Sequence, residues 1–437
     1  MPKYHIWTIG CQMNKADSAH IASYLEQCGC SACDRAEAAD IIVVNTCVVR
    51  QSAESKAVNK LESLRHLKRQ HPDLSIILTG CLVDSNTADL KRTFPHVDLF
   101  LQPQEWSVLE QWAGEFTAEG TEITEGLGNR DQGPGTRGPV TAFVPIIRGC
   151  DNFCTYCIVP YRRGREKSRP MDEIVCEVEG AVRRGAREIT LLGQNVDSYG
   201  RDLPGKSDLA DLLTELNRIK GLARIRFLTS HPKDMSRKLI ESIAHLDKVC
   251  EHISLPVQAG DDQILWAMGR GYTAEDYRRL VREVRLAIPG VALSTDVVVG
   301  FPGETVEQFQ RTFDLLQEIR FDTVHVAAYS PRSGTWAAEN LKDDVPADEK
   351  KRRREAVEVL QEGIAAEINS KLLGTTVEVL VEDRKKTKWQ GRTRTDKLVF
   401  FSDAVDRMGQ LVNVEIKKTS PWSLQGRLGQ GNSRMSV

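Results

Sequence analysis

Short apolar runs that alternate with helical patterns most strongly limit what this chain of 437 residues can fold into. Strand-like runs lie near residues 143–148, 188–192, 224–228, 252–257, 291–299 and 323–328. Helical patterns separate them, for example at 172–184, 208–219, 273–287 and 304–318. Continuous apolar runs joined by helices are typical of parallel strands that are buried on both faces. The pattern predicts an α/β domain of six β/α units that curls into a partial barrel, and a flat doubly wound sheet is the alternative.

The N-terminal part of the chain shows the same alternation on a smaller scale. Apolar runs at 4–9, 41–45 and 75–79 are separated by helical patterns at 17–27 and 51–70. This arrangement predicts an open parallel α/β domain over residues 1–117. The following segment, 118–135, is rich in Gly, Thr and Pro, and we interpret it as a linker before a central domain at 136–368.

The C-terminal part changes to a period of two. A charged helix is predicted to begin after Pro346 and to end before Gly374. Beyond it, short alternating runs with turn residues between them predict a small antiparallel β-barrel over residues 369–437. This part carries 13 Lys and Arg against 7 Asp and Glu, although the whole chain has a net charge of −2. A basic small barrel favours an RNA partner, and an ordinary solvated surface is the alternative.

Neither a signal peptide nor an apolar run long enough to span a membrane is visible in the sequence. We therefore expect a cytoplasmic protein with no membrane contact, and we expect it to be a monomer. The 11 cysteines are an odd number, and thiols stay reduced in the cytoplasm. Metal binding or catalysis is then a better explanation for them than disulfides.

Three cysteines follow the first predicted strand of the central domain at a spacing of C-x3-C-x2-C, namely Cys150, Cys154 and Cys157. A structural zinc site usually has four protein ligands, and no fourth ligand lies nearby. A [4Fe–4S] cluster held by three thiolates keeps one iron open for a substrate or cofactor. A structural zinc loop or a simple electron-transfer cluster remains the alternative.

A second set of cysteines is spread along the N-terminal domain. Cys11, Cys47 and Cys81 each follow an apolar run directly. Ligands of open parallel sheets bind at the carboxyl ends of the strands, so these three thiols are predicted to converge on a second cluster. Three unrelated buried cysteines are the alternative. The remaining cysteines are interpreted as structural, with a metal site as a weaker alternative for the first three: Cys28, Cys30, Cys33, Cys176 and Cys250.

The order of these features resembles the methylthiotransferases of the radical S-adenosylmethionine (SAM) superfamily, over nearly the whole chain. The resemblance is carried by GCQMN around Cys11, NTCVVRQSAESK around Cys47 and the three-cysteine motif of the central domain. Further similar motifs are SRP at 168–170, GQNV at 193–196, SHP at 230–232, LPVQ at 255–258, VGFPGET at 299–305 and YSPRSGT at 329–335. The C-terminal barrel is similar to the TRAM domain, an RNA-binding module of that family.

The resemblance implies two [4Fe–4S] clusters and SAM as cofactors. The cluster on Cys150, Cys154 and Cys157 is expected to cleave SAM to a 5′-deoxyadenosyl radical, and the auxiliary cluster on Cys11, Cys47 and Cys81 to carry the transferred sulfur. Residues expected to contact SAM are Tyr156, Gln194, Asn195, Gln258 and Asp296. Gly193 would let the backbone approach this ligand, and a capping or core role is the alternative for Asp296.

The same resemblance implies a reaction and its partners. We expect a methylthio group to be added to C2 of N6-dimethylallyladenosine at position 37 of tRNA, next to the anticodon. Alternatives are the same chemistry on threonylcarbamoyl-adenosine or on an aspartate of a ribosomal protein, and, less favoured, a non-catalytic iron–sulfur RNA-binding protein. Expected partners are the tRNA anticodon stem-loop, an electron donor such as flavodoxin or ferredoxin, and a sulfur source or carrier. Predicted RNA contacts are Arg162, Arg163, Arg165, Lys385, Lys386 and Arg392.

Overall fold

The structure is a computed structural model that describes residues 1–48, 51–83, 86–103, 105–114 and 139–429. The predicted linker at 118–135 lies outside the described residues. Two compact units are present, and the first combines the N-terminal part, Met1–Asp131, with Arg148–Asp151 and Cys157–Arg165. The second unit holds the rest of the chain, so the two predicted C-terminal domains pack as one body. Among the described helices, none has the length and apolar character needed to cross a membrane.

The first unit contains a five-stranded parallel sheet with the strand order β2-β1-β3-β4-β5. Its strands are β1 (Lys3–Thr8), β2 (Ser31–Ala32), β3 (Ile41–Thr46), β4 (Ser75–Gly80) and β5 (Leu99–Leu101). Its helices are α1 (Gln12–Gln27), α2 (Gln51–Gln70), α3 (Ala88–Thr93) and α4 (Trp106–Gly114), with a short 3-10 helix at Ala36–Ala38. The open parallel α/β domain predicted from the sequence is thus confirmed.

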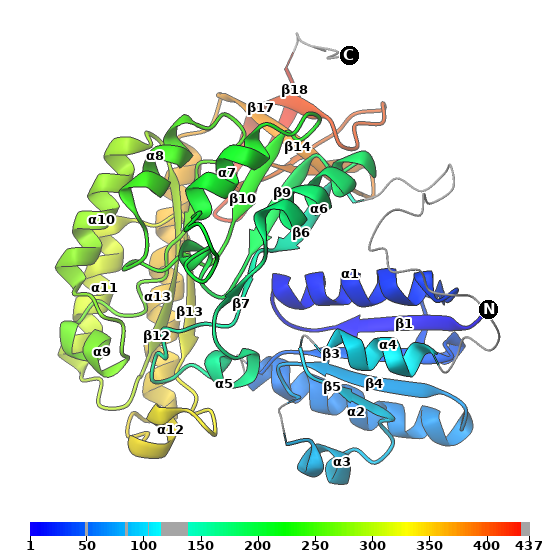
Figure 1. The fold of residues 1–437 in the computed structure, drawn as a ribbon. Coiled ribbons are helices and arrows are strands. Elements are labelled where there is room, and N and C mark those ends of the chain that lie inside the picture. The colour runs from blue at the N-terminus through cyan, green and yellow to red at the C-terminus, as the bar shows by residue number, and fades with distance from the viewer. Residues whose placement is uncertain (49–50, 84–85, 104, 115–138, 430–437) are drawn as a thin grey trace. The chain divides into compact units, whose positions relative to one another are not determined.

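The two faces of this sheet are covered by different helices, as Figure 1 shows. Ile42 and Val44 of β3 pack in one apolar core with Leu61 of α2. Ile41 and Val43 pack in the other core with residues of α1 and α4. Because successive strand residues point to opposite faces, each face of β3 is buried. The order of strands reverses between β1 and β3, and such a reversal opens a crevice at the carboxyl ends of these two strands.

Six parallel strands form the core of the second unit, in two sheets of order β10-β9-β6 and β11-β12-β13. They are β6 (Thr141–Pro145), β9 (Glu188–Leu192), β10 (Arg224–Phe227), β11 (His252–Ser254), β12 (Ala292–Val299) and β13 (Thr323–Ala328). A parallel bridge between Ile225 and Val249 brings the second sheet beside β10. The strands therefore follow one another in chain order, without the reversal that a doubly wound sheet requires. The six predicted β/α units and their curled, barrel-like arrangement are confirmed.

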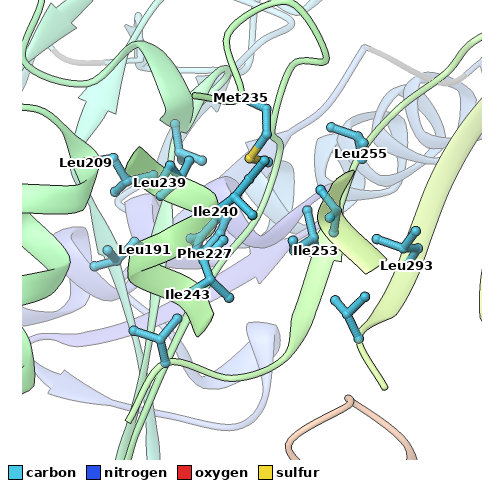
Figure 2. Close-up of a cluster of buried hydrophobic side chains, with 14 of the residues drawn as sticks. Leu191, Leu209, Phe227, Met235, Leu239, Ile240, Ile243, Ile253, Leu255 and Leu293 are labelled. Carbon is cyan, nitrogen blue, oxygen red and sulfur yellow. The ribbon is translucent and has the colours of Figure 1, made fainter. Parts of the chain in front are cut away.

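One apolar core joins the strands of both sheets to their helices. Figure 2 shows Leu191 and Phe227 from the first sheet near Ile253 and Leu293 from the second. The helices around the strands are α6 (Met171–Arg183), α7 (Leu209–Asn217), α8 (Arg237–His245), α10 (Ala274–Ala287) and α11 (Val306–Ile319). Shorter elements are β7 (Ile147–Arg148), α5 (Val159–Arg163), β8 (Lys167–Ser168), Val196–Ser198, α9 (Asp262–Ala267) and α12 (Trp336–Asn340).

The C-terminal part of the second unit is a closed barrel of order β14-β15-β16-β18-β17. It follows the long helix α13 (Ala347–Ser370) and consists of β14 (Thr376–Lys385), β15 (Lys388–Arg392), β16 (Leu398–Phe401), β17 (Leu411–Thr419) and β18 (Leu424–Leu428). The predicted small barrel is confirmed, although β16 and β18 pair in parallel. Gly391 is required by the tight closure, because a Cβ there would lie 2.1 Å from the carbonyl oxygen of Leu380.

Arginines at the start of β10 join this small barrel to the amino ends of the (β/α)6 strands. The Arg224 guanidinium donates to the Arg392 carbonyl at 2.7 Å and to Glu378 at 2.9 Å. Arg226 donates to the Thr393 carbonyl at 2.6 Å. Arg224 and Arg226 are both buried, whereas the side chain of Glu378 is 45% exposed. The small barrel therefore lies at the opposite end of the strands from their carboxyl termini, where the predicted SAM-binding residues lie.

Candidate cluster and cofactor sites

The three cysteines predicted to hold the auxiliary cluster all lie at the carboxyl end of the N-terminal sheet. Cys11 precedes α1, Cys47 follows β3 directly, and Cys81 follows β4 directly. Cys11 and Cys47 therefore flank the crevice between β1 and β3, where the strand order reverses. Cys47 and Cys81 are buried, whereas Cys11 is exposed.

Two glycines allow the turns that bring these cysteines near one another. A Cβ on Gly10 would lie 2.7 Å from the Cβ of Cys47, so the turn before Cys11 passes directly against Cys47. Gly80 has a φ of +93°, and a Cβ there would lie 2.2 Å from the carbonyl oxygen of Thr46. That same carbonyl accepts the backbone N–H of Cys81 at 2.9 Å. Both positions need glycine for steric reasons, which supports the predicted convergence of the three strand ends.

A buried amide network that the sequence reasoning missed fixes the start of α1 against the end of β3. The Asn14 amide nitrogen donates to Asn45 Oδ1 and to the Thr46 carbonyl, both at 2.9 Å. The Asn45 amide in turn donates to the Asn14 carbonyl at 2.8 Å and to Ser18 Oγ at 2.9 Å. Both asparagines are fully buried, so every bond in the network is made in a low dielectric. The only signal in the sequence is that an asparagine lies close to each of Cys11 and Cys47.

Arg163, the last residue of α5, belongs to the first unit and contacts one of these cysteines. Its Nε donates to Cys81 Sγ at 3.4 Å, and its Nη2 donates to Asp17 Oδ2 at 3.2 Å. The side chains of Arg163 and Asp17 are 3% and 7% exposed. A guanidinium this deeply buried is not placed to contact RNA, so we correct the prediction that Arg163 is an RNA contact.

The turns that carry these cysteines approach one another, but the thiols do not form a finished ligand set within the described residues. Among the residues that the structure describes, no group of three or more His, Cys, Asp and Glu side chains is arranged to hold a metal ion. Cys11 Sγ instead donates to Asn14 Oδ1 at 3.4 Å. The glycine turns, the thiol chemistry and the buried guanidinium beside Cys81 nevertheless fit an anionic iron–sulfur cluster at this edge. The assignment of Cys11, Cys47 and Cys81 as ligands remains a prediction.

The cysteines of the C-x3-C-x2-C motif lie on the segment that follows β7. In the first unit, the Cys150 backbone N–H donates to the Gly164 carbonyl at 3.2 Å, and this unit also contains Cys157. In the second unit, Cys154 is buried, and its Sγ accepts a hydrogen bond from Arg270 Nη1 at 3.4 Å. The sequence reasoning missed Arg270, which lies in the loop after α9. These three cysteines remain the predicted ligands of the SAM-cleaving cluster.

Several predicted SAM contacts lie at the carboxyl ends of the (β/α)6 strands. Tyr156 packs edge-on against Phe301, just beyond β12, with ring centroids 6.4 Å apart. The Gln258 backbone N–H donates to the carbonyl of Asp296 at 2.9 Å, which places these two predicted contacts beside each other. Gln258 has a φ of +70°, which is uncommon for a residue other than glycine. Backbone strain of this kind occurs preferentially at ligand sites.

Gln194 and Asn195 follow β9 and have free hydrogen-bonding capacity. Asn195 donates to Asp234 Oδ2 at 2.7 Å, but within the described part of the chain neither Asn195 Oδ1 nor Gln194 Oε1 has a partner. Buried acceptors without donors are unfavourable unless a ligand supplies the donors. This observation fits a ligand with an amino group. Gly193 also has a packing reason that was not predicted, because a Cβ there would lie 2.4 Å from the side chain of Ile147.

His231 is a further polar group at this end of the barrel that the sequence reasoning did not assign. Its Nδ1 accepts the backbone N–H of Lys233 at 3.3 Å, so a neutral ring carries its proton on Nε2. Burial and the nearby Arg270 lower the pKa of His231 to about 2, which keeps the ring neutral. Nε2 is buried and has no partner among the described residues. It is thus a donor available to a ligand.

The other cysteines differ in burial and form no common site. Cys30 and Cys250 are buried, and burial raises the pKa of the Cys250 thiol to about 11. Cys176 is exposed, and Cys28 and Cys33 are partly exposed. Within the described residues these five cysteines contribute to no arrangement for a metal.

The predicted RNA contacts outside α5 lie on the C-terminal barrel. Lys385 and Lys386 are exposed at the turn between β14 and β15, where Lys386 has a φ of +57°. Arg392 forms an ion pair with Asp396 at 3.2 Å and is partly exposed. In the first unit, Arg165 is exposed and pairs with Asp151, whereas Arg162 is half-buried. These five residues remain predicted RNA contacts.

Family models match three segments of the chain. Residues 3–102 match the uncharacterized protein family UPF0004, residues 144–316 match the radical SAM superfamily, and residues 370–428 match the TRAM domain. The chain is 54% identical to the tRNA-2-methylthio-N(6)-dimethylallyladenosine synthase of Dehalococcoides mccartyi, over 98% of this chain and 99% of that protein. The synthase of the same name from Herpetosiphon aurantiacus is 49% identical, over 98% and 97% of the two chains.

Solved structures with a similar fold are more distant in sequence. The radical SAM methyltransferase TsrM from Kitasatospora setae, with cobalamin and a [4Fe-4S] cluster bound, superposes with a TM-score of 0.57. It is 15% identical, and the match covers 77% of this chain and 76% of that one. The cobalamin-dependent SAM radical enzyme OxsB gives a TM-score of 0.51 at 14% identity, over 82% of this chain and 56% of that one. At these identities the likeness shows a shared fold.

Proposed function

We propose that the chain, which belongs to the family of the tRNA-2-methylthio-N(6)-dimethylallyladenosine synthases, adds a methylthio group to C2 of N6-dimethylallyladenosine at position 37 of tRNA. The observation that carries this function is the identity of about half of all residues over nearly the full length of relatives with that name. These relatives align with 98% of this chain. The enzyme is a transferase that uses SAM and two [4Fe–4S] clusters.

The substrate carbon explains why the chain needs cysteine sets in place of an acid–base pair. A hydrogen on an aromatic carbon is not acidic enough for a side-chain base to remove. When bound, the clusters and SAM supply the radical that removes this hydrogen and the sulfur that replaces it. We assign Cys150, Cys154 and Cys157 to the SAM-cleaving cluster, and Cys11, Cys47 and Cys81 to the sulfur-carrying cluster.

Within the second unit, the polar groups at the carboxyl ends of the strands would bind and orient SAM. Gln194 Oε1 and Asn195 Oδ1 would accept from its amino group, and Asp296 would accept from a ribose hydroxyl. Tyr156, held against Phe301, would pack near the adenine. A neutral His231 would add a single donor without repelling the sulfonium charge of SAM.

The RNA partner is the tRNA anticodon stem-loop, bound through the TRAM barrel. The target base lies in a single-stranded loop, so it can be splayed out of the stack into a pocket at low cost. The exposed lysines at the turn between β14 and β15 would contact its phosphates. We further propose a flavodoxin or ferredoxin as electron donor, a separate sulfur source or carrier, and a cytoplasmic location, where tRNA and reduced thiols occur together.

Nucleoside mass spectrometry tests the function directly. In a bacterium whose own synthase gene is deleted, expression of this chain should restore the 2-methylthio form of dimethylallyl-adenosine in tRNA. Restoration of the methylthiolated threonylcarbamoyl nucleoside, or of a modified ribosomal aspartate, would favour the alternative substrates. If no methylthio product returns although the protein holds its iron and cleaves SAM, the proposed function is wrong.

The double variant Lys385→Ala/Lys386→Ala is expected to weaken tRNA binding in a salt-dependent way. Each lost phosphate contact removes about 0.7 to 0.9 from the slope of log affinity against log salt, so two contacts should reduce the slope by about 1.4 to 1.8. Binding titrations at several salt concentrations measure this change. The matched control is Lys91→Ala/Lys220→Ala, which removes two exposed lysines outside the small barrel and should keep the original slope. Equal slopes for both double variants would contradict the assignment.

A further inference from the structure

Arg163 has an environment that an ordinary structural ion pair does not explain. Its side chain is 3% exposed, and its acidic partner, Asp17, is 7% exposed. An arginine and a carboxylate frequently pair through two parallel hydrogen bonds. Here one nitrogen, Nη2, bonds to Asp17, and Nε bonds to Cys81 Sγ. The guanidinium thus joins a carboxylate of α1 to a predicted cluster ligand after β4.

Both partners of Arg163 are fixed by the elements that carry the cysteines. Asp17 lies in α1, which begins immediately after Cys11, and it orients the guanidinium from one side. Ile158 directly precedes α5, the helix that carries Arg163. Its side chain packs with Cys81 and Val48 in a small apolar cluster. Since Cys81 is buried and these neighbours are apolar, water does not replace the N–H of Arg163 at the sulfur.

We propose that Arg163 is a positioning residue of the auxiliary cluster, which donates a charge-assisted hydrogen bond to the ligand sulfur of Cys81 while Asp17 holds its guanidinium in place. This inference rests on the proposed assignment of Cys81 as a cluster ligand. A cluster on three thiolates is an anion, and two of its predicted ligands, Cys47 and Cys81, are buried, where an unpaired anion is unfavourable. Hydrogen bonds to ligand sulfurs withdraw electron density and stabilise the reduced cluster. Arg163 should therefore raise the reduction potential of this cluster.

The test measures that potential without using the enzyme's activity. In the background Cys150→Ala/Cys154→Ala/Cys157→Ala, the full-length chain retains only the auxiliary cluster, and a redox titration followed by electron paramagnetic resonance reports it alone. Adding Arg163→Met should lower the ratio of reduced to oxidised cluster about tenfold at a fixed applied potential, equivalent to about 59 mV for a one-electron couple. Arg163→Lys, which keeps the charge but loses the planar fork, should give a smaller shift in the same direction.

Two controls separate this role from a general effect of charge or folding. Arg165→Met removes a positive charge from the same segment at a side chain that is 72% exposed, and it should leave the potential unchanged. Asp17→Glu keeps the negative charge but moves the carboxylate by one methylene, so it loosens the orientation of Arg163 and should shift the potential in the same direction as Arg163→Met. If Arg163→Met does not fold, Arg163→Lys and Asp17→Glu decide the question by the same titration.

An unchanged potential in folded Arg163→Met with a full auxiliary cluster would overturn the proposal. An equal shift in Arg165→Met would also overturn it, because the effect would then be one of net charge. A different result is expected if Cys81 is not a ligand of the auxiliary cluster. In that case Cys81→Ala in the same background would retain its cluster, whatever the potential of the arginine variants.

Discussion

Cys154→Ala is expected to remove one four-iron cluster and to abolish cleavage of SAM, whereas Cys47→Ala is expected to remove the other cluster and to retain some SAM cleavage. The reason is that the two predicted cysteine sets follow different strands and are expected to serve separate chemistry. Reconstituted wild-type protein should hold about eight irons, and each variant about four. Iron analysis, absorption spectra and detection of 5′-deoxyadenosine measure these outcomes. Neither variant should form the methylthiolated nucleoside.

A matched control for both variants is Cys176→Ala, since this thiol is exposed on α6 away from the strand ends. It should keep about eight irons and both activities. Loss of both clusters from either single change would contradict two independent sites. Retention of SAM cleavage in Cys154→Ala would contradict the assignment of the C-x3-C-x2-C motif.

The second large effect is expected for Arg226→Met, which should lower the free energy of unfolding of the second unit by about 3–5 kcal/mol. Arg226 Nε lies 3.0 Å from Glu188 Oε2, and the two side chains are 5% and 2% exposed. Its other nitrogens donate to the carbonyls of Thr393 and Arg394 on the small barrel. Removing the guanidinium would leave a buried carboxylate unpaired and would remove two of the hydrogen bonds that join the small barrel to β10.

Urea unfolding of the full chain, followed by hydrogen exchange, measures the stability of this unit separately from the N-terminal domain. The control Arg237→Met breaks an ion pair with Glu241 on α8, where the arginine side chain is 91% exposed. It should change the stability by no more than about 0.5 kcal/mol. Adding Glu188→Gln to Arg226→Met should restore part of the loss, because the unpaired charge is removed. A loss below about 1 kcal/mol in Arg226→Met would show that the contact between the barrels does not depend on this pair.

The sequence was informative about elements whose signal is local. The six strand runs of the central domain, the long helix after Pro346 and the period-two runs of the small barrel all appear in the structure close to their expected positions. Two motifs also needed no tertiary information, namely the three cysteines within eight residues and the cysteine that follows each of three apolar runs. Parallel strands align their carboxyl ends, so these positions already imply which residues share an edge.

Contacts between residues far apart in sequence had no such signal. Asn14 and Asn45 were not singled out, because a buried amide looks like a surface amide until its partner across the sheet is known. The basic run at 161–170 suggested only phosphate binding. Folding separates its members, since it buries Arg163 against Cys81 and leaves Arg165 in solvent. A side chain at position 193 would collide with Ile147, and this contact also arises only when the chain packs.

The sequence by itself determined the class of each domain, the two sets of cysteines and the charge of the small barrel, since periodicity, spacing and composition are properties of the chain. Only the tertiary structure decided which polar side chains are buried and what each one contacts. It placed a guanidinium at Cys81 and positioned the small barrel at the amino ends of the strands. Among the residues that it describes, it also left two acceptors after β9 without a partner. The physical reason is that the energy of a charge or an amide depends on its burial and its partner, and both arise only when distant segments pack together.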